Sequence, residues 1–311
     1  MKPMKKTITT LSAVAVLGLL GLAGCQALEQ AFAVKVEKIT HVQTNAPLEK
    51  QYSQMGQYAV AVQKYPAANK AQDYFTVYYP QTGGNYPLIV LANGTGMKVS
   101  SYEAVLQHLA SHGFVVIGSQ EGTSWTGSGV AGSLDFALSL NQNKTSPLYQ
   151  KINPAKIGVS GHSQGGVGAI NAATTQANSR LIRSVYTAST TQHRLARDLG
   201  WDYDISKIKA PYFETSGTGV FDAGKPDETA GGIAPLSSLK NNFNKINGTA
   251  VMAQRKGEDH GSMLYVPNGY MAAWFLYTLN NDSQAKQVFV GQNAEISRNS
   301  NWQNVQSKNL R

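Results

Sequence analysis

Cysteine is nearly absent from this sequence. Cys25 is the only cysteine among 311 residues, so no disulfide can form within the chain. No pair of histidines or carboxylates has the spacing of metal ligands, and we expect no metal and no other cofactor. The fold must therefore be stabilised by its core alone, and a chain of this length suits one α/β domain with a sizeable core.

Clusters of a single charge sign are lacking as well. The 27 lysines and arginines exceed the 18 aspartates and glutamates, which gives a formal net charge of +9. The basic residues are scattered along the chain, which argues against a nucleic-acid partner. We expect a monomer with a solvated basic surface.

Long apolar runs are confined to the N-terminus. Residues 1–24 begin with Lys2, Lys5 and Lys6 and continue with an almost uninterrupted apolar run from Ile8 to Ala23. This is the pattern of a secretory signal peptide, and the run is short for a membrane span. Residues 1–24 are therefore excluded from the fold.

The signal ends in Leu22-Ala23-Gly24-Cys25, which resembles the lipobox of bacterial lipoproteins. The resemblance implies cleavage before Cys25 and attachment to the membrane through a lipid on this residue. We expect residues 25–57 to form a tether. Because Gln26 rather than aspartate follows Cys25, the enterobacterial sorting pattern predicts a cell-envelope lipoprotein at the outer membrane. The pattern does not distinguish the periplasmic face of this membrane from the cell surface.

Strand and helix patterns alternate over residues 58–292, which predicts one domain with a mostly parallel central sheet and helices on both faces. The polar residues 293–311 are expected to form a loosely held tail. The expected strands are 59–63, 75–79, 88–91, 114–117, 156–160, 184–187, 212–215 and 250–254. The expected helices are 100–112, 131–140, 164–177, 236–243 and 269–279.

The run Gly161-His162-Ser163-Gln164-Gly165 follows a buried strand and opens a helix. The pattern G-x-S-x-G places a serine on a turn so tight that only glycines fit on either side of it. The helix that follows directs its N–H groups and positive dipole end at the place where an oxyanion would form. We therefore predict that Ser163 is a nucleophile in an α/β-hydrolase fold.

His260 is the best candidate for the base that activates Ser163. The chain has six histidines, and His260 lies between an expected strand and the final helix, where hydrolases of this architecture place the base. A surface histidine is the alternative.

The acid that orients the histidine should lie between Ser163 and His260, on a loop at the end of a strand. Asp222 fits this position best. Asp227 and Glu228 on the same loop are its rivals, and Asp259 would have to fold back on its neighbour.

Two backbone N–H groups are needed to stabilise an oxyanion. We expect one from Gln164, directly after the nucleophile. The other is expected from Thr95, in the glycine-rich loop after the third strand.

The segment 109–116 together with Gly161–Gly166 resembles the bacterial cutinase-like polyester hydrolases and related lipases, which belong to the dienelactone-hydrolase-like α/β-hydrolases. That resemblance extends over residues 75 to 290. In these families the acid lies shortly before an Ala-Pro pair, here Ala234-Pro235 after an apparent insertion at 225–232, which supports Asp222. The family's C-terminal disulfide has no counterpart in this chain.

The departures from the family concern the substrate. Thr95 stands where those enzymes have an aromatic clamp residue, Gln164 replaces a methionine, and a second clamp tryptophan is missing. Trp125, His162 and Trp201 are candidates for the substrate pocket, although the two tryptophans could equally be packing residues.

These patterns predict a lipid-anchored serine carboxylic ester hydrolase that acts through an acyl-enzyme. We expect short- to medium-chain aliphatic esters as substrates, with polyesters as a further candidate. The alternatives are a catalytically silent surface binding or adhesion lipoprotein on the same scaffold, and a serine peptidase or acyltransferase.

Overall fold

The computed structural model describes residues 34–225 and 231–311, and its centre is one nine-stranded sheet with the order β1-β2-β4-β3-β5-β6-β7-β8-β9. Neighbours from β4 to β8 run parallel, whereas β1, β2 and β9 pair antiparallel at the edges. The strands are β1 Val60–Pro66, β2 Tyr74–Pro80, β3 Tyr86–Ala92, β4 Val115–Ser119, β5 Ile152–His162, β6 Ile182–Ala188, β7 Tyr212–Gly217, β8 Ala250–Arg255 and β9 Trp302–Lys308.

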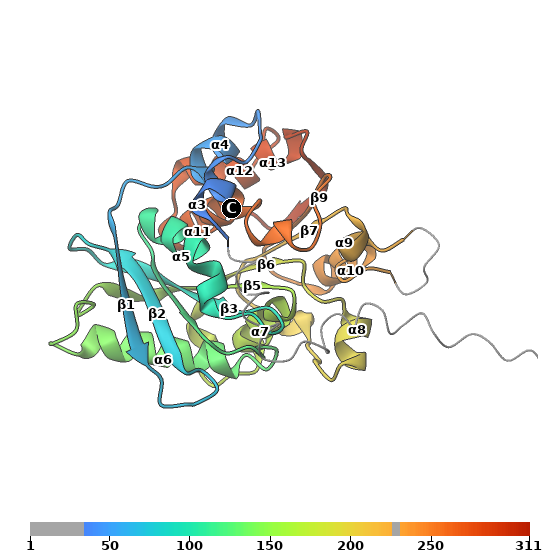
Figure 1. Cartoon of the computed structure of the whole chain (residues 1–311). Helices are drawn as coiled ribbons and strands as arrows, with labels where there is room; N and C mark the ends of the chain where they lie inside the picture. The colour runs from blue at the N-terminus through green and yellow to red at the C-terminus, as the bar shows by residue number, and fades with distance from the viewer. Residues whose placement is uncertain (1–33, 226–230) are drawn as a thin grey trace, which may run out of the picture.

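Helices cover both faces of the sheet, and Figure 1 shows α5 above β3 and α6 below it. The α-helices are α3 Val36–Thr40, α4 Pro47–Ser53, α5 Glu103–Ser111, α6 Ser128–Gln142, α7 Gln164–Thr174, α8 His193–Asp198, α9 Val220–Ala223, α10 Leu236–Lys245, α11 Asn268–Asn280, α12 Ser283–Phe289 and α13 Glu295–Arg298. The 3-10 turns are η1 Val99–Tyr102, η2 Ser179–Leu181, η3 Ile205–Lys207 and η4 Ser262–Leu264. The α/β-hydrolase architecture is thereby confirmed.

Two apolar cores sit on opposite faces of the sheet because successive strand residues point to opposite sides. On β3, Ile89 and Leu91 belong to the core beneath α5, α11 and α12. Leu88 and Val90 belong to the core beneath α6 and α7. All eight predicted strands and all five predicted helices are present in this arrangement. The carboxyl ends of the parallel strands therefore meet at one edge, where the loops that follow them can form a site.

The N-terminal boundary of the domain needs correction. Residues 34–57 were expected to belong to a tether, yet they contain α3 and α4, in which Ile39 and Tyr52 are buried. The Glu49 carboxylate forms a buried ion pair with Arg255 at 3.1 Å. These short helices are stable because their few apolar side chains pack on the domain, a tertiary effect that local sequence patterns do not show.

The C-terminal boundary needs the same correction. Residues 293–311 were expected to form a polar tail, but they fold as α13 and the edge strand β9. β9 pairs with β8 over Ala250–Arg255, and Trp302 is buried. An edge strand can stay polar because it buries only part of its surface, so this segment lacks the apolar alternation by which strands are predicted.

Some predictions lie outside the described residues. The signal peptide, Cys25 and the first part of the tether fall within 1–33, and the rival acids Asp227 and Glu228 fall within 226–230. Among the helices that are described, none combines the length and the hydropathy required to cross a bilayer.

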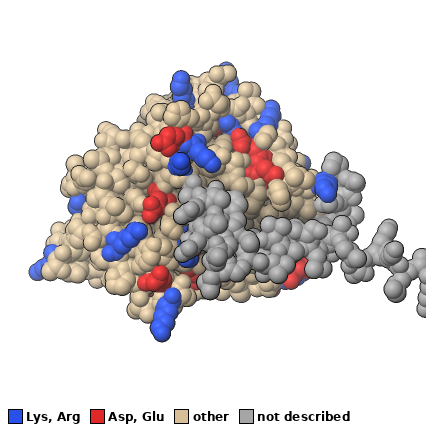
Figure 2. Space-filling view, viewed as in Figure 1, with Lys and Arg blue, Asp and Glu red and all other residues tan. Residues whose placement is uncertain are grey.

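Charged side chains of both signs are scattered over the face in Figure 2. Four large apolar side chains are more than a third exposed among the described residues: Met55, Val62, Val220 and Phe221. Val220 and Phe221 directly precede Asp222 on α9. The segment that follows β7 therefore presents an apolar pair to the solvent.

Candidate active site

Ser163 occupies a sharp turn between β5 and α7. Its φ of 59° lies in the left-handed region, with ψ at −123°. The glycines are sterically required: a Cβ on Gly161 would lie 2.0 Å from the Gly165 carbonyl oxygen, and one on Gly165 would lie 2.1 Å from the Ala92 carbonyl oxygen. This is the elbow geometry that G-x-S-x-G predicts, and it leaves Ser163 half-buried at the carboxyl end of β5.

Asp222 and His260 come together from neighbouring parallel strands. Asp222 lies on α9 after β7, and His260 lies in the loop after β8. The Nδ1–H of His260 donates to Asp222 Oδ1 at 2.8 Å. Because this bond fixes the proton on Nδ1, Nε2 is left as the basic nitrogen, which is the tautomer that a general base requires.

The second carboxylate oxygen of Asp222 has two donors of its own. Ser189 Oγ donates to Asp222 Oδ2 at 2.5 Å, and the Gly217 N–H donates to the same oxygen at 2.7 Å. Asp222 is completely buried. Its orientation toward His260 is therefore set by donors from both β6 and β7.

The two expected oxyanion donors flank the elbow. Thr95 lies in the turn after β3, and Gln164 is the first residue of α7. The neighbouring Gly94 N–H donates to the Tyr102 hydroxyl at 2.9 Å. Within the described part of the chain, by contrast, the N–H groups of Thr95 and Gln164 have no acceptor. Both remain available to an oxyanion at the positive end of α7.

Side-chain hydrogen bonds hold the loop after β4 against the elbow. Asn93 Nδ2 donates to the carbonyl oxygens of Ser119 and Glu121 at 2.7 and 2.8 Å. Gln164 Oε1 accepts from the Ser124 N–H at 2.9 Å. Burial raises the pKa of Glu121 in this loop to about 7. The Gln164 side chain thus ties the elbow to the loop after β4.

His162 does not line an open substrate pocket, which corrects that prediction. Its side chain is 6% exposed, because the elbow turns it into the protein. Its Nε2–H donates to the carbonyl oxygen of His260 at 2.8 Å, and the two rings lie 4.6 Å apart. Burial, followed by the nearby His260, lowers the pKa of His162 to about 3. The residue directly before Ser163 is therefore in contact with the loop after β8.

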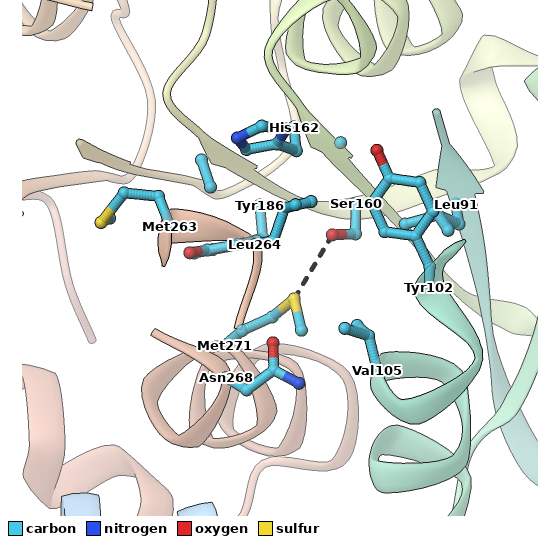
Figure 3. Close-up of a pocket in the computed structure, with 12 residues that line it drawn as sticks. Leu91, Tyr102, Val105, Ser160, His162, Tyr186, Met263, Leu264, Asn268 and Met271 are labelled. Carbon is cyan, nitrogen blue, oxygen red and sulfur yellow. Dashed lines mark hydrogen bonds between the residues drawn. The ribbon is translucent and has the colours of Figure 1, made fainter. Parts of the chain in front are cut away.

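A cavity of about 20 Å³ lies beneath the elbow, and His162 is part of its lining (Figure 3). Tyr102 from η1 and Met271 from α11 line it as well. Ser160 Oγ donates to Met271 Sδ at 3.3 Å across this space. The cavity has room for about one water molecule and is too small for an ester substrate.

Trp125 and Trp201 both pack, half-buried, against the core beneath α6 and α7. Asn171 links the two segments, since its Nδ2 donates to the Trp125 carbonyl oxygen at 2.8 Å and to the Asp202 carbonyl oxygen at 2.9 Å. These contacts account for both tryptophans as packing residues, and a role in the substrate pocket stays a prediction.

Sequence reasoning missed Ser189 and underrated Asp259. Ser189 directly follows β6 and has a φ of 49°. The one feature of the sequence that could have indicated it is its position after a parallel strand, at the same edge of the sheet as the other loops of the site. Asp259 was considered as a rival acid. The structure places its carboxylate on backbone N–H groups of the acid loop.

A serine elbow, a paired aspartate and histidine, and two free N–H donors at the carboxyl ends of parallel strands define the α/β-hydrolase class of active site. The family model described as PET hydrolase-like matches residues 42–195, which include Thr95 and the elbow. Over these residues the chain is similar to the PET hydrolase-like family.

Curated relatives match a shorter region. The chain is 30% identical to chlorophyllase-1, chloroplastic, of Citrus unshiu over 93 residues, which is 28% of each chain. It is also 30% identical to cutinase est1 of Thermobifida alba over 103 residues, which is 32% of this chain and 34% of that protein. Cutinase est2 of the same organism matches at the same identity and over the same length. The chain thus spans about a third of the length of these relatives.

Proposed function

We propose that the protein is a serine carboxylic ester hydrolase. The observation that carries this proposal is the 2.8 Å hydrogen bond between Asp222 and His260 beside the elbow of Ser163. The similarity to cutinases and to a chlorophyllase supports the same reaction class.

The proposed mechanism has two halves that pass through an acyl-enzyme. Ser163 Oγ attacks the ester carbonyl carbon while His260 Nε2 takes the hydroxyl proton. The N–H groups of Thr95 and Gln164 stabilise the oxyanion, and the protonated His260 gives its proton to the departing alcohol. A water molecule then attacks the acyl-enzyme while His260 takes one of its protons. His260 returns this proton to Ser163 Oγ as the bond between Oγ and the acyl carbon breaks, which releases the carboxylic acid.

The decisive test combines turnover of p-nitrophenyl butyrate with labelling by a fluorophosphonate probe. Wild type should turn over and label, and Ser163→Ala should lose both, with kcat lowered by several orders of magnitude. Ser139→Ala, which removes an exposed hydroxyl on α6, is the matched control and should behave as wild type. Labelling that persists in Ser163→Ala, or a well-folded wild type without turnover, would contradict the proposal.

The substrate class is proposed as short- to medium-chain aliphatic esters, with aliphatic polyesters as a further candidate. Thr95 offers a methyl and a hydroxyl group where related enzymes offer an aromatic ring, so an aromatic acid loses a stacking partner here. Product analysis with esters, amides and acceptor alcohols separates hydrolysis of esters from peptidase and acyltransferase activity.

We also propose that the protein is an envelope lipoprotein held at the outer membrane through Cys25. The support is the lipobox-like Leu22-Ala23-Gly24-Cys25 after an apolar run, with Gln26 following it. Cys25→Ser should change both the membrane fractionation and the mature mass. An unchanged mass together with unchanged fractionation would rule out lipidation.

A further inference from the structure

The acid loop, residues 217–224, and the histidine loop, residues 256–261, are joined along their backbones. The Glu258 carbonyl oxygen accepts from the N–H groups of Thr218 and Gly219, both at 2.8 Å. The Gly257 N–H donates to Thr218 Oγ1 at 2.9 Å. The two loops leave the adjacent strands β7 and β8, so these bonds set how the acid and the base meet.

The carboxylate of Asp259 completes this junction at the two proposed triad residues themselves. Its Oδ1 accepts from the N–H of Asp222 at 2.9 Å and from the N–H of His260 at 2.8 Å. Its Oδ2 accepts from the N–H of Phe221 at 3.1 Å. One oxygen atom therefore holds the main chains of both the acid and the base.

The surroundings of Asp259 are shaped to hold this carboxylate in place. A Cβ on Gly219 would lie 2.4 Å from Asp259 Cγ, so the close approach requires glycine there. The backbone of Asp259 is also fixed, since its N–H donates to Ser262 Oγ at 3.1 Å and its carbonyl oxygen accepts from the Ser262 N–H at 2.9 Å. Neither the backbone nor the carboxylate can shift without breaking several bonds.

We propose that Asp259 is a positioning residue, which brackets the main chains of Asp222 and His260 and so preserves the geometry of their side-chain hydrogen bond. The inference rests on the proposed ester hydrolase function. A carboxylate suits this task because it accepts several N–H donors at once and forms stronger hydrogen bonds than a neutral acceptor. Without this carboxylate, the remaining backbone bonds between the two loops end at Gly219. No bond would then hold the main chain of Asp222 at a fixed distance from that of His260.

The first experiment replaces Asp259 with alanine and measures kcat and KM on p-nitrophenyl butyrate per active site, with sites counted by fluorophosphonate labelling. We expect kcat to fall about 10- to 100-fold with little change in KM, because a small misplacement of a catalytic group has an effect of this size. Glu258→Ala is the control. It removes a carboxylate one residue away whose side chain has no hydrogen bond among the described residues, and it should keep wild-type kcat.

A second pair of variants tests the bracket without removing a charge. Gly219→Ala should displace the Asp259 carboxylate and lower kcat as Asp259→Ala does. Gly261→Ala introduces the same methyl group in the histidine loop, where no atom lies within 4 Å of it, and should have no effect. A further variant, Asp259→Asn, removes the charge but keeps one oxygen for the N–H groups of Asp222 and His260, and it should recover most of kcat.

A directly structural readout accompanies the kinetics. Amide hydrogen exchange at Asp222 and His260 should accelerate in Asp259→Ala, and the downfield proton signal of the His260 Nδ1–H should weaken. If Asp259→Ala only lowers the melting temperature, or if Asp259→Asn is as defective as Asp259→Ala, the bracket is overturned. A wild type that neither turns over nor labels overturns the proposed function, and the bracket with it.

Discussion

At the scale of single residues, the strained backbone of Ser163 is held by its neighbours on both sides. Its N–H donates to the Ala188 carbonyl oxygen at 3.0 Å. Its own carbonyl oxygen accepts from the Gly166 N–H at 2.9 Å. A left-handed conformation at a non-glycine residue persists only where its surroundings impose it in this way. The position of Ser163 therefore depends on close backbone contacts that only glycine allows.

Gly161→Ala should abolish most of the activity. The new Cβ would lie 2.0 Å from the Gly165 carbonyl oxygen, so the elbow must shift, and a shift of this kind lowers kcat by about 100-fold or more. The measurement is kcat on p-nitrophenyl butyrate alongside thermal unfolding. Gly83→Ala has open space around the new methyl group and serves as the control. Unchanged kcat in Gly161→Ala would show that the elbow tolerates a wider turn.

Thr95→Tyr tests the substrate preference. Stacking on one ring contributes on the order of 1 kcal/mol beyond area burial, so wild type, which lacks both clamp aromatics of the related enzymes, should bind a terephthalate unit roughly 30-fold more weakly than they do. Tyrosine should raise kcat/KM on bis(hydroxyethyl) terephthalate relative to p-nitrophenyl butyrate. A wild type that already favours the terephthalate ester, or a variant without any gain on it, would contradict the clamp argument.

At the scale of elements, a buried polar junction ties both ends of the described chain to β8. Glu49 on α4 pairs with Arg255 at the end of β8. The Glu49 carboxylate also accepts from Trp302 Nε1 at 2.8 Å and from Asn299 Nδ2 at 2.7 Å. The N-terminus of α4 is capped by Glu295, whose oxygens accept from two N–H groups at 2.7 Å. In a chain without disulfides, this junction connects segments that are about 250 residues apart.

Arg255→Met should destabilise the protein strongly. It leaves the Glu49 carboxylate buried without its cation, which typically costs about 3–5 kcal/mol of unfolding free energy. The measurement is urea unfolding at neutral pH. Lys256→Met removes an exposed positive charge from the next position and should change stability by less than about 0.5 kcal/mol. Equal effects of the two variants would mean that the junction is solvated and weak.

The sequence predicts the central elements well because their apolar patterns are intrinsic to each segment. The strand at 88–91 is continuously apolar, as a strand buried on both faces must be. β9 and α4 escape prediction because Trp302 and Tyr52 gain their burial only from distant partners. The same distinction applies to the site. The G-x-S-x-G pattern marks Ser163, and the loop before the last packed helix marks His260, whereas the bracket at Asp259 consists of side-chain-to-backbone bonds that no pattern records.

At the scale of the whole molecule, the two cores contain titratable groups whose burial makes stability depend on pH. Burial lowers the pKa of His108 and of His162 to about 3. Burial raises the pKa of Glu214 on β7 to about 8. The histidines contribute stability above their unfolded pKa of about 6.5, and that contribution is lost as pH falls toward 3. Glu214 acts in the opposite direction, and its contribution is lost as pH rises from about 4.5 to 8.

His108→Gln isolates one of these contributions. Between about pH 6 and pH 4, the unfolding free energy of wild type should fall more steeply than that of the variant, by up to about 1.4 kcal/mol per pH unit. The measurement is urea unfolding at several pH values. Gln107→Ala, an exposed change on the same helix, should leave the slope of wild type intact. Parallel pH curves for wild type and His108→Gln would show that the His108 ring takes up its proton over the same pH range in the folded and unfolded states, which contradicts the lowered pKa.

The closed base of the loop after Asp222 has a consequence for how this protein can vary in sequence. The Ile233 N–H donates to the Phe221 carbonyl oxygen at 2.7 Å, and the Ala234 N–H donates to that of Asp222 at 3.0 Å. These two bonds hold residues 233–234 beside residues 221–222. Because longer loops cost little closure entropy, we expect a change in the number of residues between Asp222 and Ile233 to leave these bonds in place. Segments of different length and chemistry could then be exchanged next to the proposed triad while the hydrogen bond between Asp222 and His260 keeps its geometry.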